Sequence, residues 1–312
     1  MTGRFGLGLA AGLLAALLFL SLTRDVSNGP LLAFIAPLPL MLAALGASQM
    51  VAVVAVAVGV VAVTLVGDWA FGLTFLAIAG APSLVVANRA LLWRRTEGGE
   101  VEWYPVGRLL AWLTVTSMAV FAAVAFTLPG HADGIRGWMT ESLSRTLDLL
   151  GNELPADQRQ AASRTLAAVL PGMVMSVWVL MAVLNAMAAQ AALVGIRRNR
   201  RPPPAYGGLD LPDWLGGVLV TAALLGSTGG SVGYVAANMA AVALMPFSFL
   251  GVATIHRHVV ARPGARIGLV VLYGVLVIFF VWALIPAAVL GLVRFLQMRF
   301  RRGVPSAGGK EE

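Results

Sequence analysis

Long apolar segments recur along the whole chain, and the charged residues are confined to the intervals between them. Of the 312 residues, 59% are hydrophobic and 12% are charged, and the mean hydropathy is +0.86. A globular core cannot bury so much apolar surface. Runs of about 20 apolar residues are typical of helices that cross a bilayer, and the alternation of a membrane β-barrel is absent. The sequence therefore predicts an all-α polytopic transmembrane bundle of about eight or nine membrane helices.

Six membrane helices are expected in a core over residues 1–196. The first is interpreted as a membrane helix and not as a cleaved signal peptide, because no small-x-small cleavage site is evident and further apolar segments follow directly. The expected spans are Gly6–Leu22, Pro30–Gly46, Ser48–Val66, Trp69–Trp93, Gly107–Leu128 and Leu166–Ile196.

Arginines set the expected orientation of this core. Arg94, Arg95 and Arg108 flank one loop, and "RRNRR" at Arg197–Arg201 marks another. Loops rich in arginine face the cytoplasm in most membrane proteins. Both ends of the six-helix core are therefore expected inside, with the N-terminus in the cytoplasm.

The remainder of the chain is divided into a basic, proline-rich cytoplasmic linker (197–212), C-terminal membrane helices (213–293) and a basic cytoplasmic tail (294–312) that is expected to be disordered. Three apolar stretches lie here, at Leu211–Leu225, Val232–Ile255 and Ile267–Val293. Three full spans would place the basic tail outside, against the rule for arginine-rich segments. We favour two full spans, with the short first stretch re-entrant or half-spanning.

An amphipathic outer segment is expected at 129–165, between the fifth and sixth spans. Apolar residues recur there at steps of three and four, which predicts a helix on the membrane surface or over the mouth of the bundle. Such a helix either covers the bundle or acts as a lid on a cavity, and Pro155 is placed to begin a second short helix. The candidate lid residues are Ile135, Trp138, Met139, Leu143 and Leu147.

Two prolines, Pro37 and Pro39, interrupt the second span. Neighbouring helices can satisfy the backbone groups that proline frees within a membrane, so we expect a kinked or divided helix near the outer face. Asn185 and Asn238 are polar residues at membrane depth, where side chains normally face protein or water. These four residues are the candidates for lining a cavity, and interhelical hydrogen bonding is the other role open to the two asparagines.

Gly8, Gly12 and Ala16 form a ladder of small residues on one face of the first span. Small residues at this spacing let helix backbones approach closely. The ladder serves either packing within the chain or the docking of a partner's helices.

Little in the sequence indicates an enzyme, and no cofactor is expected. The chain has no cysteine, and "HRH" at His256–His258 has no nearby third metal ligand. The glycine-rich "GSTGGSVG" at Gly226–Gly233 lacks the lysine of a phosphate-binding loop. The net charge of +8 lies in loops beside the spans, so a nucleic-acid partner is not expected.

Two segments carry family resemblances. "GPLLAFIAPLPLMLAALGASQMVAVVAVAVGVVAV" at Gly29–Val63 resembles the second and third helices of the S components of energy-coupling-factor transporters, and the small-residue ladder resembles their docking face. The whole chain, including "VEWYPVGRLLAWL" (101–113) and "MPFSFLGVATIH" (245–256), more closely resembles the YybS-like family of bacterial membrane proteins. These resemblances imply a bacterial cytoplasmic membrane, and no vitamin-binding motif is matched.

Two functional hypotheses follow. In the first, the protein is a transport-related component that binds a small-molecule ligand and meets a membrane protein partner or a second copy of itself. In the second, it is a membrane scaffold that recruits cytoplasmic or envelope-assembly partners through its basic loops and tail. A polar-lined cavity near the outer face would favour the first hypothesis.

Overall fold

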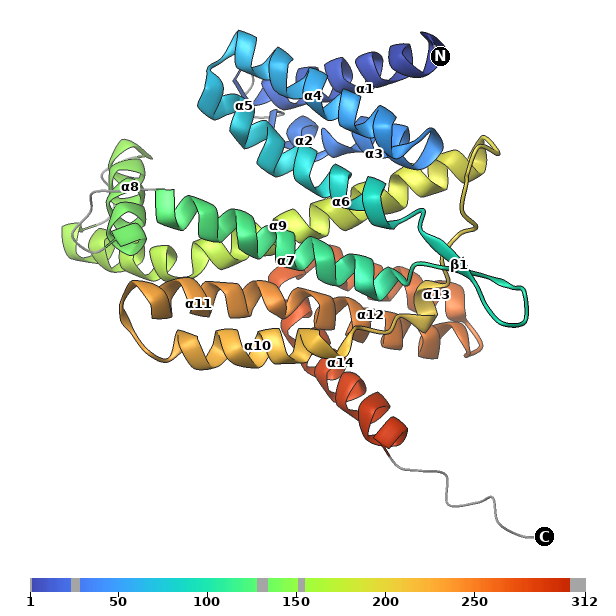
Figure 1. Ribbon diagram of the computed structural model, residues 1–312. Coiled ribbons are helices and arrows are strands. Elements are labelled where there is room, and N and C mark those ends of the chain that lie inside the picture. The colour runs from blue at the N-terminus through green and yellow to red at the C-terminus, as the bar shows by residue number, and fades with distance from the viewer. Residues whose placement is uncertain (1, 24–28, 128–133, 151–154, 304–312) are drawn as a thin grey trace.

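The computed structural model describes residues 2–23, 29–127, 134–150 and 155–303, and almost all of them lie in helices (Figure 1). In chain order the helices are α1 (Thr2–Leu20), α2 (Gly29–Phe34), α3 (Pro37–Gly46), α4 (Gln49–Val66), α5 (Trp69–Phe75), α6 (Ala81–Arg89), α7 (Val106–Thr127), α8 (Gly134–Leu150), α9 (Ala156–Gly195), α10 (Asp213–Gly226), α11 (Gly230–Ala243), α12 (Met245–Val260), α13 (Ala265–Ile278) and α14 (Phe280–Gly303). A π-helical turn, Leu76–Gly80, joins α5 to α6. Short 3₁₀ turns lie at Ser21–Thr23 and Tyr206–Gly208. Strands β1 (Trp93–Arg95) and β2 (Val101–Trp103) form an antiparallel hairpin.

The predicted class is confirmed. In the described part of the chain, eight helical segments are long and apolar enough to cross a membrane, and α10 and α13 are shorter apolar helices. Large apolar side chains remain exposed along these helices, such as Leu65 on α4 and Trp282 on α14. In water such a surface would aggregate, whereas lipid tails cover it without cost.

The helices form layers that α9 holds together. Figure 1 shows α1–α6 above, α7 and α9 in the middle, and α10–α12 below. At 40 residues, α9 is the longest helix of the described chain, and it packs against α3 on one side and against α7 and α11 on the other. A helix of this length measures about 60 Å, so it reaches beyond the hydrocarbon core.

The two ends of the bundle differ in charge and in structure. The β1–β2 hairpin, the linker 197–212 and the start of α1 lie at one end, which we call the arginine-rich end (Figure 1). Helix α8 and the turn between α10 and α11 lie at the other, which we call the opposite end. The C-terminal half of α14 returns to the arginine-rich end, because Arg299 donates to the carbonyl oxygen of Leu211 and pairs with Asp213.

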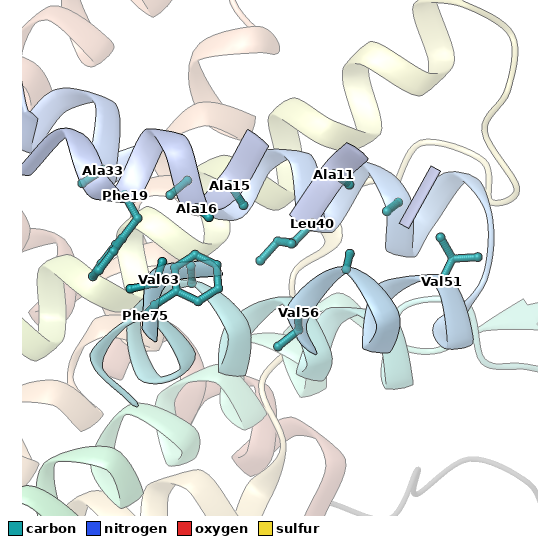
Figure 2. Packing of buried hydrophobic residues seen from close by; sticks show 14 residues of the cluster. Ala11, Ala15, Ala16, Phe19, Ala33, Leu40, Val51, Val56, Val63 and Phe75 are labelled. Carbon is teal, nitrogen blue, oxygen red and sulfur yellow. The ribbon is translucent and has the colours of Figure 1, made fainter. Parts of the chain in front are cut away.

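The small-residue ladder of α1 packs within the chain. A side chain on Gly12 would overlap the carbonyl oxygen of Ala55 on α4, and Ala16 is buried. Figure 2 shows α1 lying along α4, with apolar side chains filling the space beside them. Phe19 and Phe75 close this cluster with ring centroids 5.3 Å apart in an edge-to-face arrangement. Of the two roles that the ladder could serve, the structure shows packing within the chain.

The second span is divided at the predicted place. Helix α2 ends at Phe34 and α3 begins at Pro37, with the two prolines in the first turn of α3. Proline is well tolerated in a first turn, because its missing N–H has no partner there in any case. The regular half of the second span therefore begins at Pro37.

Three boundaries differ from expectation. Pro155 does not begin a separate short helix, because the helix that follows it continues as α9 through Gly195. The stretch 267–293 is two helices that meet at Phe279. The first ten residues of the tail, 294–303, continue α14, and 304–312 lie outside the described residues. The apolar pattern does not indicate the end of α13, because it continues through Phe279 and no glycine or proline stands there.

Candidate functional site

A pocket of about 570 Å³ opens between the two halves of the bundle near its arginine-rich end. Its walls come from α6, α7 and α9 on one side and from the linker, α12 and α13 on the other. Most of its lining is aliphatic, for example Leu109, Leu113, Leu180 and Leu276. Such a lining offers an apolar guest a large contact surface and few hydrogen bonds.

The polar side chains of the pocket gather where the linker crosses the bundle. Gln190 comes from α9, His256 from α12 and Tyr273 from α13, while Arg201 and Tyr206 come from the linker. The Oη atom of Tyr273 lies 3.0 Å from Nδ1 of His256, so these two side chains form a hydrogen-bonded pair between α12 and α13.

Arg201 is the only charged side chain that is buried in the part of the chain described by the structure, with 8% of its surface exposed. Its Nη1 atom donates to the carbonyl oxygen of Ala90, 3.0 Å away, at the C-terminal end of α6. Carbonyl groups at a helix C-terminus lack partners within the helix and carry partial negative charge. The guanidinium therefore caps α6 and is held against the pocket wall.

The backbone of Arg201 is fixed as firmly as its side chain. The Nε2 atom of Gln190 donates to the Arg201 carbonyl oxygen at 2.8 Å, and Nδ2 of Asn199 donates to the same oxygen at 3.0 Å. The neighbouring Arg200 donates through Nη1 to the carbonyl oxygen of Ala47, the C-cap of α3, at 2.6 Å. The linker is therefore tied to the ends of three helices.

Burial lowers the pKa of the Arg201 guanidinium from its ordinary value, because the charged form loses water. The group stays charged near neutral pH, since arginine is not deprotonated in proteins under such conditions. No carboxylate forms an ion pair with it within the described ranges. The guanidinium carbon also lies 5.9 Å from the centre of the Trp103 ring on β2. A buried positive charge therefore stands beside an apolar pocket, balanced by a helix-end carbonyl group and an aromatic ring and by no carboxylate of the described residues.

Asn185 lies away from this pocket and completes the divided second span. Its Nδ2 atom donates to the carbonyl oxygen of Phe34 at 2.9 Å and to that of Met181 at 2.8 Å. The amide of Leu38, which would pair with Phe34 in a continuous helix, bonds to Ile35 instead. Asn185 thus supplies the hydrogen bond that the break between α2 and α3 removes.

Asn238 and Tyr234, one turn apart on α11, supply hydrogen bonds to the backbone groups of α9 that lack helical partners around Pro171. Proline leaves the carbonyl oxygen of Ala167 without its helical donor, and the Tyr234 hydroxyl donates to it. Asn238 Oδ1 accepts from the Gly172 amide at 2.7 Å, and its Nδ2 donates to the Ala168 carbonyl oxygen at 3.2 Å. Both asparagines therefore form interhelical hydrogen bonds, one of the two roles open to them.

None of the four cavity candidates lines the pocket. Pro37, Pro39, Asn185 and Asn238 are all buried in the bundle, and the pocket walls are made by other residues. Arg201 was not a sequence-based candidate, because one arginine in "RRNRR" resembles its exposed neighbours. Its burial depends on the linker folding back over the ends of α6 and α9.

The candidate lid lies at the opposite end of the bundle from the pocket. The predicted amphipathic helix is α8, and its Ile135 packs against Phe121 and Tyr234. Trp138, Met139, Leu143 and Leu147 are half-buried on the same helix. An ion pair between Arg159 and Asp148 ties α8 to the start of α9. No described residue of α8 belongs to the lining of the pocket.

Comparison with known proteins gives a family. The family model described as "Predicted membrane protein (DUF2232)" matches residues 13–293. No curated protein and no solved structure matches the chain. Since the match covers most of the 312 residues, and the eight apolar helices agree with its description, this chain belongs to the DUF2232 family of predicted membrane proteins.

Proposed function

We propose that this protein binds a small apolar or amphiphilic molecule in the pocket between its two halves, as a transport-related component and not as an enzyme. The pocket itself supports this proposal: its volume of about 570 Å³ lies within the usual size of small-molecule sites. This pocket is not the polar-lined cavity near the outer face that the sequence-based hypothesis of ligand binding calls for, because its lining is mostly aliphatic and it lies near the arginine-rich end. The proposal therefore rests on the volume and the lining of the pocket that the structure contains.

The arrangement of charge supports an orientation. Arginines of the β1–β2 hairpin, the linker and the end of α14 gather at one end of the bundle. By the rule that arginine-rich loops stay inside, this end faces the cytoplasm of a bacterial cell. We therefore propose that the pocket opens toward the inner leaflet of the cytoplasmic membrane and that the N-terminus is cytoplasmic.

We also propose, from the resemblance to S components and to YybS-like proteins, that the protein works with a membrane protein partner. A ligand-binding membrane subunit needs a partner that supplies energy, and the face that S components use for docking corresponds here to the ladder of α1, which α4 covers. A membrane partner would therefore contact another surface of the bundle.

Photolabelling tests ligand binding. The protein, purified in mild detergent, is exposed to a neutral long-chain alcohol that carries a diazirine, and labelled residues are mapped by mass spectrometry. We expect labels on pocket residues such as Met187 and Tyr206. Labels confined to lipid-facing positions such as Leu65 would refute the proposal and favour the scaffold.

A matched pair of variants sharpens this experiment. Ala186 lines the pocket, whereas Ala188 on the same helix is exposed outside it. Ala186→Phe places a ring in the pocket and should abolish labelling there. Ala188→Phe adds the same ring to the lipid-facing surface and should leave pocket labelling unchanged.

A further inference from the structure

We propose that the pocket selects single-chain amphiphiles with an anionic carboxylate or phosphate head group, and that Arg201 binds this group. This inference rests on the proposed function, because it names the chemical class of the molecule that the pocket holds. The observation that carries it is the buried charge of Arg201 on the pocket wall, without a carboxylate partner in the described chain.

The hydrogen bonds of Arg201 leave room for a ligand. Its Nη1 atom is engaged by Ala90, while Nε and Nη2 have no protein acceptor among the described residues. A guanidinium presents its N–H groups as a planar fork that matches the two oxygens of a carboxylate or phosphate. The bond to Ala90 holds that fork in place before the ligand arrives.

The energetics favour an anion over a neutral head group. A buried charge without a counter-charge is costly. The partial charges of a helix end and the electron-rich face of Trp103 balance it only in part. An anionic head group would supply the missing charge in a site that excludes much of the water. A hydroxyl head group would accept a hydrogen bond but would leave the charge unbalanced.

The order of the lining residues along the helices separates a polar part of the pocket from an apolar part. Gln190 and Arg201 belong to its polar part, together with Tyr206, His256 and Tyr273, and Val183 and Leu180 continue the wall along α9. From Gln190 to Leu180 the rise of the helix amounts to about 15 Å, over which the lining facing the pocket is aliphatic. Leu109 and Leu113 continue the opposite wall along α7 in the same way. An extended alkyl chain would contact these aliphatic walls with its charged end at Arg201.

Three probes of equal chain length test the inference on the wild-type protein. Each carries a diazirine on its alkyl chain, and the head groups are a carboxylate, a phosphate and a hydroxyl. We expect the carboxylate, the phosphate or both to label the pocket with about tenfold or greater apparent affinity than the alcohol. Whichever anion labels better identifies the source as a fatty acid or a phosphorylated lipid.

Variants assign the selectivity to Arg201. Arg201→Gln should reduce anion labelling to the level of the alcohol, and Arg201→Lys should retain part of it, because a lysine keeps the charge and loses the fork. Arg198→Gln is the matched control, since Arg198 belongs to the same basic run and is exposed. If Arg201→Gln fails to fold after losing its bond to Ala90, the comparison of the three probes on the wild-type protein still decides.

The outcomes separate the two proposals. Equal pocket labelling by all three probes would overturn the selectivity for anions and leave the binding of an apolar solute standing. Anion selectivity that persists in Arg201→Gln would overturn the role of Arg201. Absence of pocket labelling by every probe would remove the proposed function and this inference together.

Discussion

Asn238 on α11 accepts a hydrogen bond from the Gly172 amide and donates one to the carbonyl oxygen of Ala168. A single side chain thus bonds to both groups of one broken backbone hydrogen bond in α9. These are the donor and the acceptor that an uninterrupted α9 would pair with each other. The side chain therefore couples the position of α11 to the proline turn of α9.

Replacing Asn238 by alanine should destabilise the bundle by about 1–3 kcal/mol, because buried N–H and C=O groups lose their partners. Thermal unfolding in detergent measures the effect as a lower midpoint temperature. Thr254→Ala is the control, since the Thr254 hydroxyl bonds only to a carbonyl of its own helix, that of Leu250. Equal midpoints for both variants would contradict the bridging role.

Tyr234 and Pro171 should be energetically coupled. Tyr234→Phe leaves the carbonyl oxygen of Ala167 without its donor. In a Pro171→Ala background, the new amide at position 171 can pair with this oxygen along the helix. We expect the loss of midpoint temperature caused by Tyr234→Phe to be clearly smaller in that background, and strict additivity would argue against the arrangement.

Helices α12 and α14 should tolerate no side chain at their closest approach. A methyl group on Gly251 would overlap the carbonyl oxygen of Ala287, and one on Gly291 would overlap that of Phe247. Gly251→Ala should therefore cost about 1–3 kcal/mol through overpacking, or reduce the yield of folded protein. Gly274→Ala on α13 is the control, because nothing lies within 4 Å of a side chain built there. Size-exclusion profiles and unfolding midpoints compare the two.

Glycine at position 197 should stabilise the end of α9. Arg197 has a φ of 56°, and the amide of Arg198 bonds to the Leu193 carbonyl oxygen while that of Arg197 bonds to Val194. This is the hydrogen-bond pattern of a Schellman motif, whose left-handed residue is usually glycine. Arg197→Gly should raise stability by about 1 kcal/mol, and Arg198→Gly, outside the left-handed region, should not.

The absence of native cysteines makes the orientation directly testable. Glu97 lies in the β1–β2 hairpin and Thr228 in the turn between α10 and α11, at the two ends of the bundle, and both are exposed. In spheroplasts, a membrane-impermeant maleimide should label Thr228→Cys from outside and Glu97→Cys only after lysis. The reverse pattern would place the pocket toward the outer leaflet.

Several features of the fold could be predicted because they follow from local patterns. The division of the second span follows from Pro37 and Pro39, which cannot donate backbone hydrogen bonds in a helix interior. The amphipathic helix α8 follows from apolar residues at steps of three and four. The close contact at Gly12 follows from the spacing of small residues, whereas its partner, α4, does not.

The roles of the polar residues were harder to predict. Asn185 and Asn238 are recognisable as polar groups at membrane depth. A sequence does not show that each bonds to a backbone group at a break in a distant helix, Phe34 for Asn185 and Gly172 for Asn238. The exposed neighbours of Arg201 in the sequence conceal its burial in the same way.

By itself, the sequence determined that this chain is an all-α membrane bundle, where its second span is divided and which segments carry the charge, because apolar length, proline and arginine act locally. Only the tertiary structure decided where the pocket lies, which charge is buried beside it and which amides repair the broken helices. Those properties depend on which helices become neighbours, and in a bilayer that choice comes from close packing and hydrogen bonding between distant segments. The linker fold that places Arg201 against Ala90 is one such result.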